Sequence, residues 1–191
     1  MPINFEEKMK EIESRRSTSV LVDPAPSDEQ IKLLLQSAQL APDHGRLKPW
    51  QFIVVKGEAR HALGELYLQA ALADKADLSD ERKERVRKMP LRAPLIIIAA
   101  TKVVENHKVP VLEQALATGA AVQNMLLSAQ SLNYGTMWRT GDMAYSDVVK
   151  EGLGLRSEDV IAAFLYIGSI GAEPKARPEL DYSACCVEWN G

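Results

Sequence analysis

The sequence predicts an α/β or α+β protein in which helices alternate with strands. Two observations lead to this prediction: apolar residues recur at helical spacing in several segments, and apolar runs of strand length separate those segments. In chain order the pattern is helix, helix, strand, helix, strand, helix, strand, helix, strand and an irregular tail. The 191 residues suit a single domain, 1–191, that is long enough to bury a substantial core.

The N-terminal residues predict an amphipathic helix, because apolar side chains recur at i, i+4 and i+7 from Phe5. We expect this helix to end near residues 14–17 and residues 18–22 to be extended before the proline turn at 24–26. Ser27 with Gln30 has capping-box spacing, which predicts the start of a second helix.

That second helix should stop at residues 41–42, where a proline follows an alanine. A polar loop over 43–49 then leads to a strand over 50–55 and a helix over 58–72. Residues 74–89 are strongly charged, and they predict either a solvated helix or a mobile segment.

The second half of the chain is more apolar. Residues 95–101 (LIIIAAT) are apolar on both faces and predict a buried strand. Residues 111–132 predict a helix that is apolar on nearly all sides, which favours a partner subunit as part of its cover. A short strand over 134–139, a helix over 145–152 and a buried strand over 160–167 follow.

Composition excludes several classes of protein. The net charge of −3 argues against nucleic acid or an anionic membrane as a partner, because both require a basic excess. No run of apolar residues is long enough to span a membrane, and the charged N-terminus is unlike a signal peptide. A disulfide between the adjacent Cys185 and Cys186 would be strained, so we expect reduced thiols and a cytoplasmic location.

Common catalytic motifs are missing from the sequence. There is no G-x-G-x-x-G fingerprint, no P-loop and no G-x-S-x-G elbow. The three histidines lack partners at metal-ligand spacing, so no metal site is expected.

Four polar clusters remain as candidate ligand sites, each with a structural alternative. Residues 15–17 (RRS) offer two guanidinium groups and a hydroxyl to a phosphate, although a solvated helix end has the same composition. The loop over 41–50 could present backbone N–H groups to a polar ligand, or it could be an ordinary turn before a buried Trp50.

The third cluster, residues 133–141, contains glycines that allow a ligand to approach the backbone, although it could also be a core strand with Trp138 packed inside. The fourth cluster contains Lys175 and Arg177, which could reach a phosphate from one side of an extended segment or belong to a solvated tail.

In this order and spacing, the clusters resemble the FMN-dependent nitroreductase family, and in particular its compact bacterial NAD(P)H nitroreductases. The marks are RRS at 15–17, APDH followed by PW within 41–50, ENHKVP at 105–110 and GTMWRTG at 135–141. The resemblance implies an α+β fold with a central, mostly antiparallel sheet flanked by helices. It also implies a homodimer with FMN at each subunit interface.

The resemblance further implies which residues contact FMN, in three groups. The phosphate group is Arg15, Arg16, Ser17, Lys175 and Arg177. The flavin group from the same chain is Trp138, Arg139 and Thr140, and the group from the other subunit is Leu40 and His44.

The implied activity is transfer of electrons from NAD(P)H, by a ping-pong mechanism, to nitroaromatic, quinone or related small-molecule acceptors. No catalytic side chain is expected, because the flavin supplies the chemistry. A flavin-binding carrier or redox sensor without physiological turnover is the alternative, and an interaction domain without cofactor is a third. Arg46 and Lys48 depart from the family pattern, and we hypothesise that their charges favour anionic acceptors.

Overall fold

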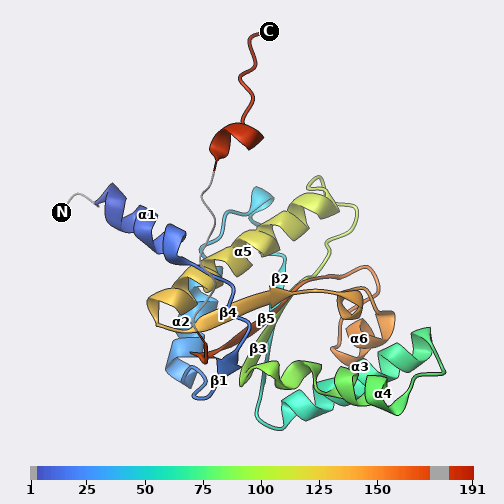
Figure 1. Cartoon of the computed structure of the whole chain (residues 1–191). Helices are drawn as coiled ribbons and strands as arrows, with labels where there is room; N and C mark the ends of the chain where they lie inside the picture. The colour runs from blue at the N-terminus through green and yellow to red at the C-terminus, as the bar shows by residue number, and fades with distance from the viewer. Residues whose placement is uncertain (1–3, 173–180) are drawn as a thin grey trace.

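A computed structural model describes residues 4–172 and 181–191 and shows one central five-stranded sheet (Figure 1). The strands are β1 (Leu21–Val22), β2 (Trp50–Lys56), β3 (Leu95–Thr101), β4 (Gly135–Arg139) and β5 (Val160–Ile170). The order across the sheet is β1-β5-β3-β2, and β4 pairs with β5 on the edge that also carries β1. All the pairs between these strands are antiparallel, so the predicted α+β class with an antiparallel sheet is confirmed.

The middle of the sheet is buried on both faces. Every residue of β3 is buried, as its continuous apolar run predicts. Ile98 lies opposite Ile53 of β2 and Phe164 of β5, so three apolar side chains cross the sheet in register.

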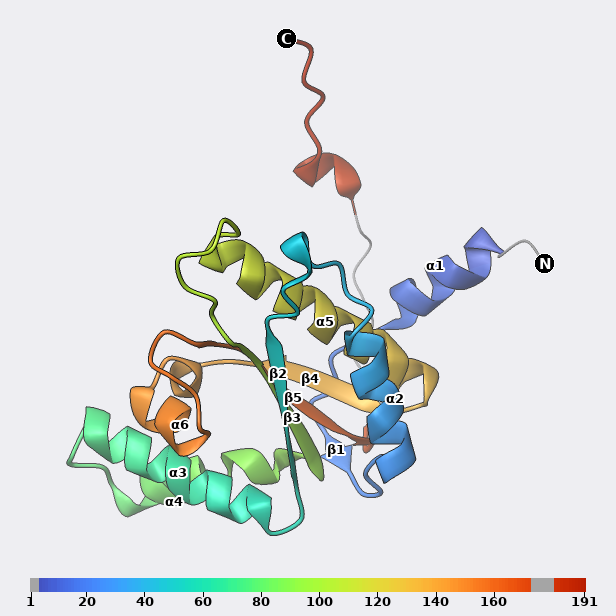
Figure 2. The same cartoon turned by 180° about the vertical axis from the view of Figure 1, so that it is seen from behind.

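Helices form a layer on each face of the sheet (Figures 1 and 2). Their bounds are α1 (Phe5–Ser14), α2 (Asp28–Ala38), α3 (Ala59–Asp74), α4 (Asp80–Arg87), α5 (Val111–Ser131) and α6 (Asp147–Gly152). The core between the sheet and α2 and α5 is separate from the core under α3, α4 and α6. Helix α1 projects away from both layers, and its C-terminal end points to the sheet (Figure 1).

Local signals in the sequence set several of these boundaries. The capping box of α2 is formed, since the Gln30 N–H donates to Ser27 Oγ at 3.3 Å and the Ser27 N–H donates to Gln30 Oε1 at 2.9 Å. The charged segment 74–89 contains α4, which is fixed by the buried Val86 and by an Arg87–Glu65 ion pair of 2.9 Å. Of the two alternatives for this segment, the helix is correct.

Within residues 4–172 and 181–191, no helix combines the length and the apolar character needed to cross a membrane. No group of three or more His, Cys, Asp or Glu side chains there could hold a metal ion. Cys185 and Cys186 are both exposed, and no disulfide joins them.

Candidate functional site

The Arg15-Arg16-Ser17 cluster lies where α1 ends beside the edge strand β4. The Thr18 N–H donates to the Thr136 carbonyl at 2.8 Å, and Ser17 forms a bridge with the same residue. Arg15 and Arg16 are half-buried, whereas Ser17 is exposed. The chain therefore holds two guanidinium groups and a hydroxyl against one edge of the sheet.

Arg16 also caps its own helix. Its Nη1 donates to the carbonyl of Glu13 and, at 3.0 Å, to the carbonyl of Arg15. These bonds satisfy carbonyl groups at the C-terminus of α1, which have no partner inside the helix. A guanidinium has five N–H donors, so further donors remain for a ligand.

Trp138, Arg139 and Thr140 occupy the end of β4, next to that cluster. Successive strand residues point to opposite faces. Trp138 lies toward α5, close to Gly119, and its Nε1 donates to the Ala162 carbonyl at 2.9 Å. Arg139 lines a cavity on the opposite face, as does Thr140. A single ligand can therefore contact all three residues only if it wraps around the edge of the sheet and reaches both faces.

The loop between α2 and β2 carries the residues predicted to reach a second subunit. Leu40 is 81% exposed, and Nδ1 of His44 pairs with the Glu113 carboxylate at the N-terminal end of α5. Arg46 and Lys48 both have positive φ, at 57° and 47°, and the Lys48 N–H donates to Asp43 Oδ2 at 2.6 Å. Positive φ is uncommon for residues other than glycine, so this loop has a specific shape.

The structure does not bring the Arg15–Ser17 cluster and His44 together within one chain. Gln130 of α5 donates to the Glu11 carbonyl at 2.8 Å, whereas His44 pairs with Glu113. These two positions of α5 are about 25 Å apart at 1.5 Å per helical residue. The His44 loop also adjoins β2, three strand spacings or about 14 Å from β4.

Lys175 and Arg177 lie outside the residues that the structure describes. Their predicted contact with the phosphate therefore stays a prediction.

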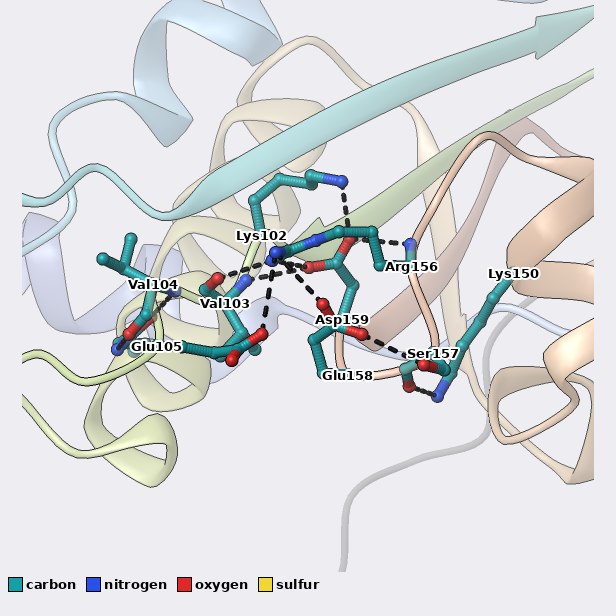
Figure 3. A network of polar contacts seen from close by, with 10 residues as sticks. Lys102, Val103, Val104, Glu105, Lys150, Arg156, Ser157, Glu158 and Asp159 are labelled. Carbon is teal, nitrogen blue, oxygen red and sulfur yellow. Dashed lines mark hydrogen bonds and ion pairs between the residues drawn. The ribbon is translucent and has the colours of Figure 1, made fainter.

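A buried carboxylate that the sequence reading missed holds the loop next to His44. Asp159 is completely buried and accepts from Lys102 Nζ at 2.5 Å, the Val103 N–H at 2.9 Å and Arg156 through both its N–H and Nη2 at 2.9 Å (Figure 3). Burial raises the pKa of this carboxyl, but hydrogen bonds from Arg156, Lys102 and Val103 outweigh burial and hold the pKa well below its usual range.

Gln114 fixes the other end of the same loop. Its Oε1 accepts from the Val104 N–H at 2.9 Å, and its Nε2 donates to the carbonyls of Val104 and Val109 at 3.0 Å. A side chain at Gly45 would come within 3.1 Å of Val109. Asp159 and Gln114 thus shape the surface against which the His44 loop rests.

Three comparisons with known proteins extend these observations. A family model described as "Nitroreductase family" matches residues 12–169. The chain is 42% identical over 156 residues to "Putative NAD(P)H nitroreductase YdjA" of Escherichia coli strain K12, an alignment that covers 82% of this chain and 84% of that protein.

Two solved structures have the same fold. A nitroreductase-like family protein from Bacillus cereus aligns over 100% of both chains with a TM-score of 0.82 and 23% identity. A nitroreductase with bound FMN from Bacteroides fragilis aligns over 95% of this chain and 99% of its own, with a TM-score of 0.73 and 20% identity.

Proposed function

The chain belongs to the nitroreductase family, and from this premise we propose that it is an FMN-dependent oxidoreductase. It takes electrons from NAD(P)H and passes them, by a ping-pong mechanism, to a nitroaromatic, quinone or related acceptor. The donor named for the Escherichia coli relative and the FMN named for the Bacteroides fragilis structure support this choice. We also propose that residues 1–191 act as one domain and that the protein works in the cytoplasm, where NAD(P)H is available.

One observation supports a phosphate-bearing flavin more than any other. Arg15–Ser17 and Trp138–Thr140 are separated by more than a hundred residues, yet they meet at one edge of the sheet. Guanidinium groups and a hydroxyl donate to phosphate oxygens, and the half-exposed Trp138 offers an aromatic surface beside them. The donor set therefore fits FMN, with Lys175 and Arg177 proposed as further phosphate contacts.

The residues assigned to FMN do not all meet within one chain, so we propose a homodimer. His44 is too far from the Arg15–Ser17 cluster to share its ligand unless a second copy supplies it, and we assign Leu40 to the same partner contribution from the family resemblance. Beside them, Leu112 and Leu116 at the N-terminal end of α5 are 70% and 63% exposed. An apolar patch of this kind next to half of a ligand site suits a symmetric interface.

When bound, FMN would supply the redox chemistry of accepting and donating electrons. The chain would bind the phosphate through Arg15, Arg16 and Ser17 and place the flavin along β4. The Arg139 guanidinium would supply fixed positive charge where negative charge develops during reduction. His44 of the partner subunit would close the site from the other side.

Purification of the full chain tests the proposal. We expect a yellow dimer that oxidises NADH or NADPH when a nitroarene or quinone is added. A flavin-containing protein without turnover would indicate the carrier or sensor instead. A colourless protein that does not bind added FMN would contradict both.

A pair of serine variants tests the location of the site. Ser17→Ala should weaken FMN binding roughly five- to tenfold, because one hydrogen bond to the phosphate is lost. Ser19→Ala, at an exposed serine two residues away, is the matched control and should leave FMN affinity unchanged. Equal affinities in the two variants would contradict the proposed site.

A further inference from the structure

The face of the sheet opposite α5 contains a cavity of about 1020 Å³. Its walls come from the C-terminal half of α3, from α4 and from the segment that follows β4. The volume is at the upper end of the range for small-molecule sites. Of the residues assigned above to FMN that the structure describes, only Arg139 and Thr140 line this cavity.

A buried tyrosine in the cavity wall has no hydrogen bond of standard geometry. Tyr67 is 2% exposed, and its hydroxyl lies beside that of Tyr166 but forms no such bond with any residue that the structure describes. Its ring packs edge-on against Phe164, with ring centroids 5.5 Å apart, so the side chain is held in place. Buried hydroxyl groups in proteins almost always have a partner. An unpartnered hydroxyl in a cavity wall therefore marks a place for a ligand acceptor.

Positive charge lines the same cavity. Its charged lining consists of Lys75, Arg82, Arg92 and Arg139 against Asp74 and Asp142. Within residues 4–172 and 181–191, none of the three arginines forms an ion pair. Cations that no carboxylate neutralises are available to an anionic ligand.

Two of these arginines lie near a second buried tyrosine. Burial raises the pKa of Tyr166, and the charges of Arg92 and Arg139 act in the opposite direction. Both arginines line the same cavity as Tyr67 and Tyr166.

Apolar side chains line much of the remaining surface, among them Ala71, Leu78, Met89 and Met143. Such a lining suits an organic ring rather than a hydrated inorganic ion. The two aspartates reduce the positive excess, which favours a monoanion over a dianion.

We infer that this cavity binds a small aromatic carboxylate, with its ring against the apolar wall and its carboxylate facing Arg92. The Tyr67 hydroxyl would gain an acceptor in the complex. Because binding rather than turnover is proposed, the site does not depend on the proposed redox activity.

Calorimetry with 2-naphthoate on the full chain, carrying whatever flavin it retains, tests this site directly. We expect one 2-naphthoate per chain, and roughly tenfold weaker binding of the neutral, similarly shaped 2-naphthamide. Flavin absorbance is followed during the same titration, and the amount of bound flavin should not change.

Three variants locate the binding. Arg92→Gln should lower the affinity for 2-naphthoate roughly tenfold, and Tyr67→Phe should lower it several-fold. Tyr67→Phe should unfold at nearly the same temperature as the parent, since its hydroxyl makes no hydrogen bond of standard geometry. Arg85→Gln, on α4 but outside the cavity lining, is the control and should bind like the parent.

The inference would be overturned by no binding, by equal affinity for 2-naphthamide, by equal affinity in all variants, or by competition from inorganic phosphate in the same concentration range. Release of FMN by 2-naphthoate would also overturn it, because the cavity would then belong to the flavin. A protein that binds 2-naphthoate but neither binds nor uses flavin would contradict the proposed function and leave this inference standing.

Discussion

The two ends of α5 differ in how the chain covers them. At the C-terminal end, Gln130 donates to Glu11 and Ser14 at 2.8 and 2.7 Å, so α1 is held by its own chain. At the N-terminal end, Leu112 and Leu116 face solvent beside the His44–Glu113 pair, and we call this end the open end of α5. The C-terminal end of α5 is thus bonded to α1 of its own chain, whereas the exposed leucines at the open end support the proposed second copy.

A charge placed at the open end should have the largest effect. Leu116→Glu puts a carboxylate into the proposed apolar interface, where burial without a partner is costly. We expect the dissociation constant of the dimer to rise about a thousandfold or more, with loss of FMN. Sedimentation and flavin absorbance measure both. Tyr145→Glu, at an exposed position lining the cavity on the other face, is the control, and a dimeric Leu116→Glu variant would contradict the interface.

Loss of the buried carboxylate beside the open end should have the next largest effect. Asp159→Ala leaves Lys102 Nζ and the Val103 N–H without their acceptor and removes one partner of Arg156, which keeps the Val103 carbonyl and Glu158. Because both cations are partly exposed and can reach water, we expect a loss of about 3 kcal/mol, at the lower end of the range for a broken buried pair. Denaturant unfolding measures this loss. Glu158→Ala, at the exposed neighbour, should unfold almost like the parent, and equal stability of the two variants would refute the role of Asp159.

Acid should weaken the same network by a smaller amount. The pKa of Asp159 is lower in the folded chain than in the unfolded chain, so the unfolded chain binds the proton more readily. The stabilisation is therefore complete above the unfolded pKa of about 3.9 and is lost as the pH falls through the folded value. The free energy of unfolding should fall more steeply below about pH 4 in the parent than in Asp159→Asn. Parallel curves would show that Asp159 does not contribute.

The smallest effect concerns the choice of acceptor at the open end. Lys48 is exposed in the loop that carries His44, so its charge is screened by solvent. We expect Lys48→Gln to lower turnover of an anionic nitroarene relative to a neutral one by about two- to fivefold. Steady-state assays of the two acceptors give this ratio. An unchanged ratio would exclude Lys48 as a determinant of acceptor charge.

The elements of the fold could be predicted where one local signal dominates. The apolar run of β3 and the capping box of α2 each specify their element without help from the rest of the chain. The antiparallel order of the sheet came from the family resemblance, because strand pairing depends on contacts between distant segments.

The features that the sequence reading missed arise from tertiary contacts. Asp159 looks like one of many acidic residues in the sequence, and only folding places Lys102 and Arg156 around it. Tyr67 reads as a core residue of α3, and its unpartnered hydroxyl becomes visible only with the cavity around it. The Ser-Glu-Asp stretch directly before the apolar run of β5 was the available signal for Asp159.

A heterodimer of two defective chains tests most directly whether both ends of α5 build one site. One chain carries Ser17→Glu, which repels the phosphate, and the other carries His44→Ala, which removes the partner's contribution. Each homodimer should bind FMN weakly. The purified heterodimer should bind about one FMN with the affinity of the parent, because one of its two sites carries both substitutions and the other carries neither. A heterodimer with no site of parental affinity would show that both groups act within one chain and would contradict the divided site.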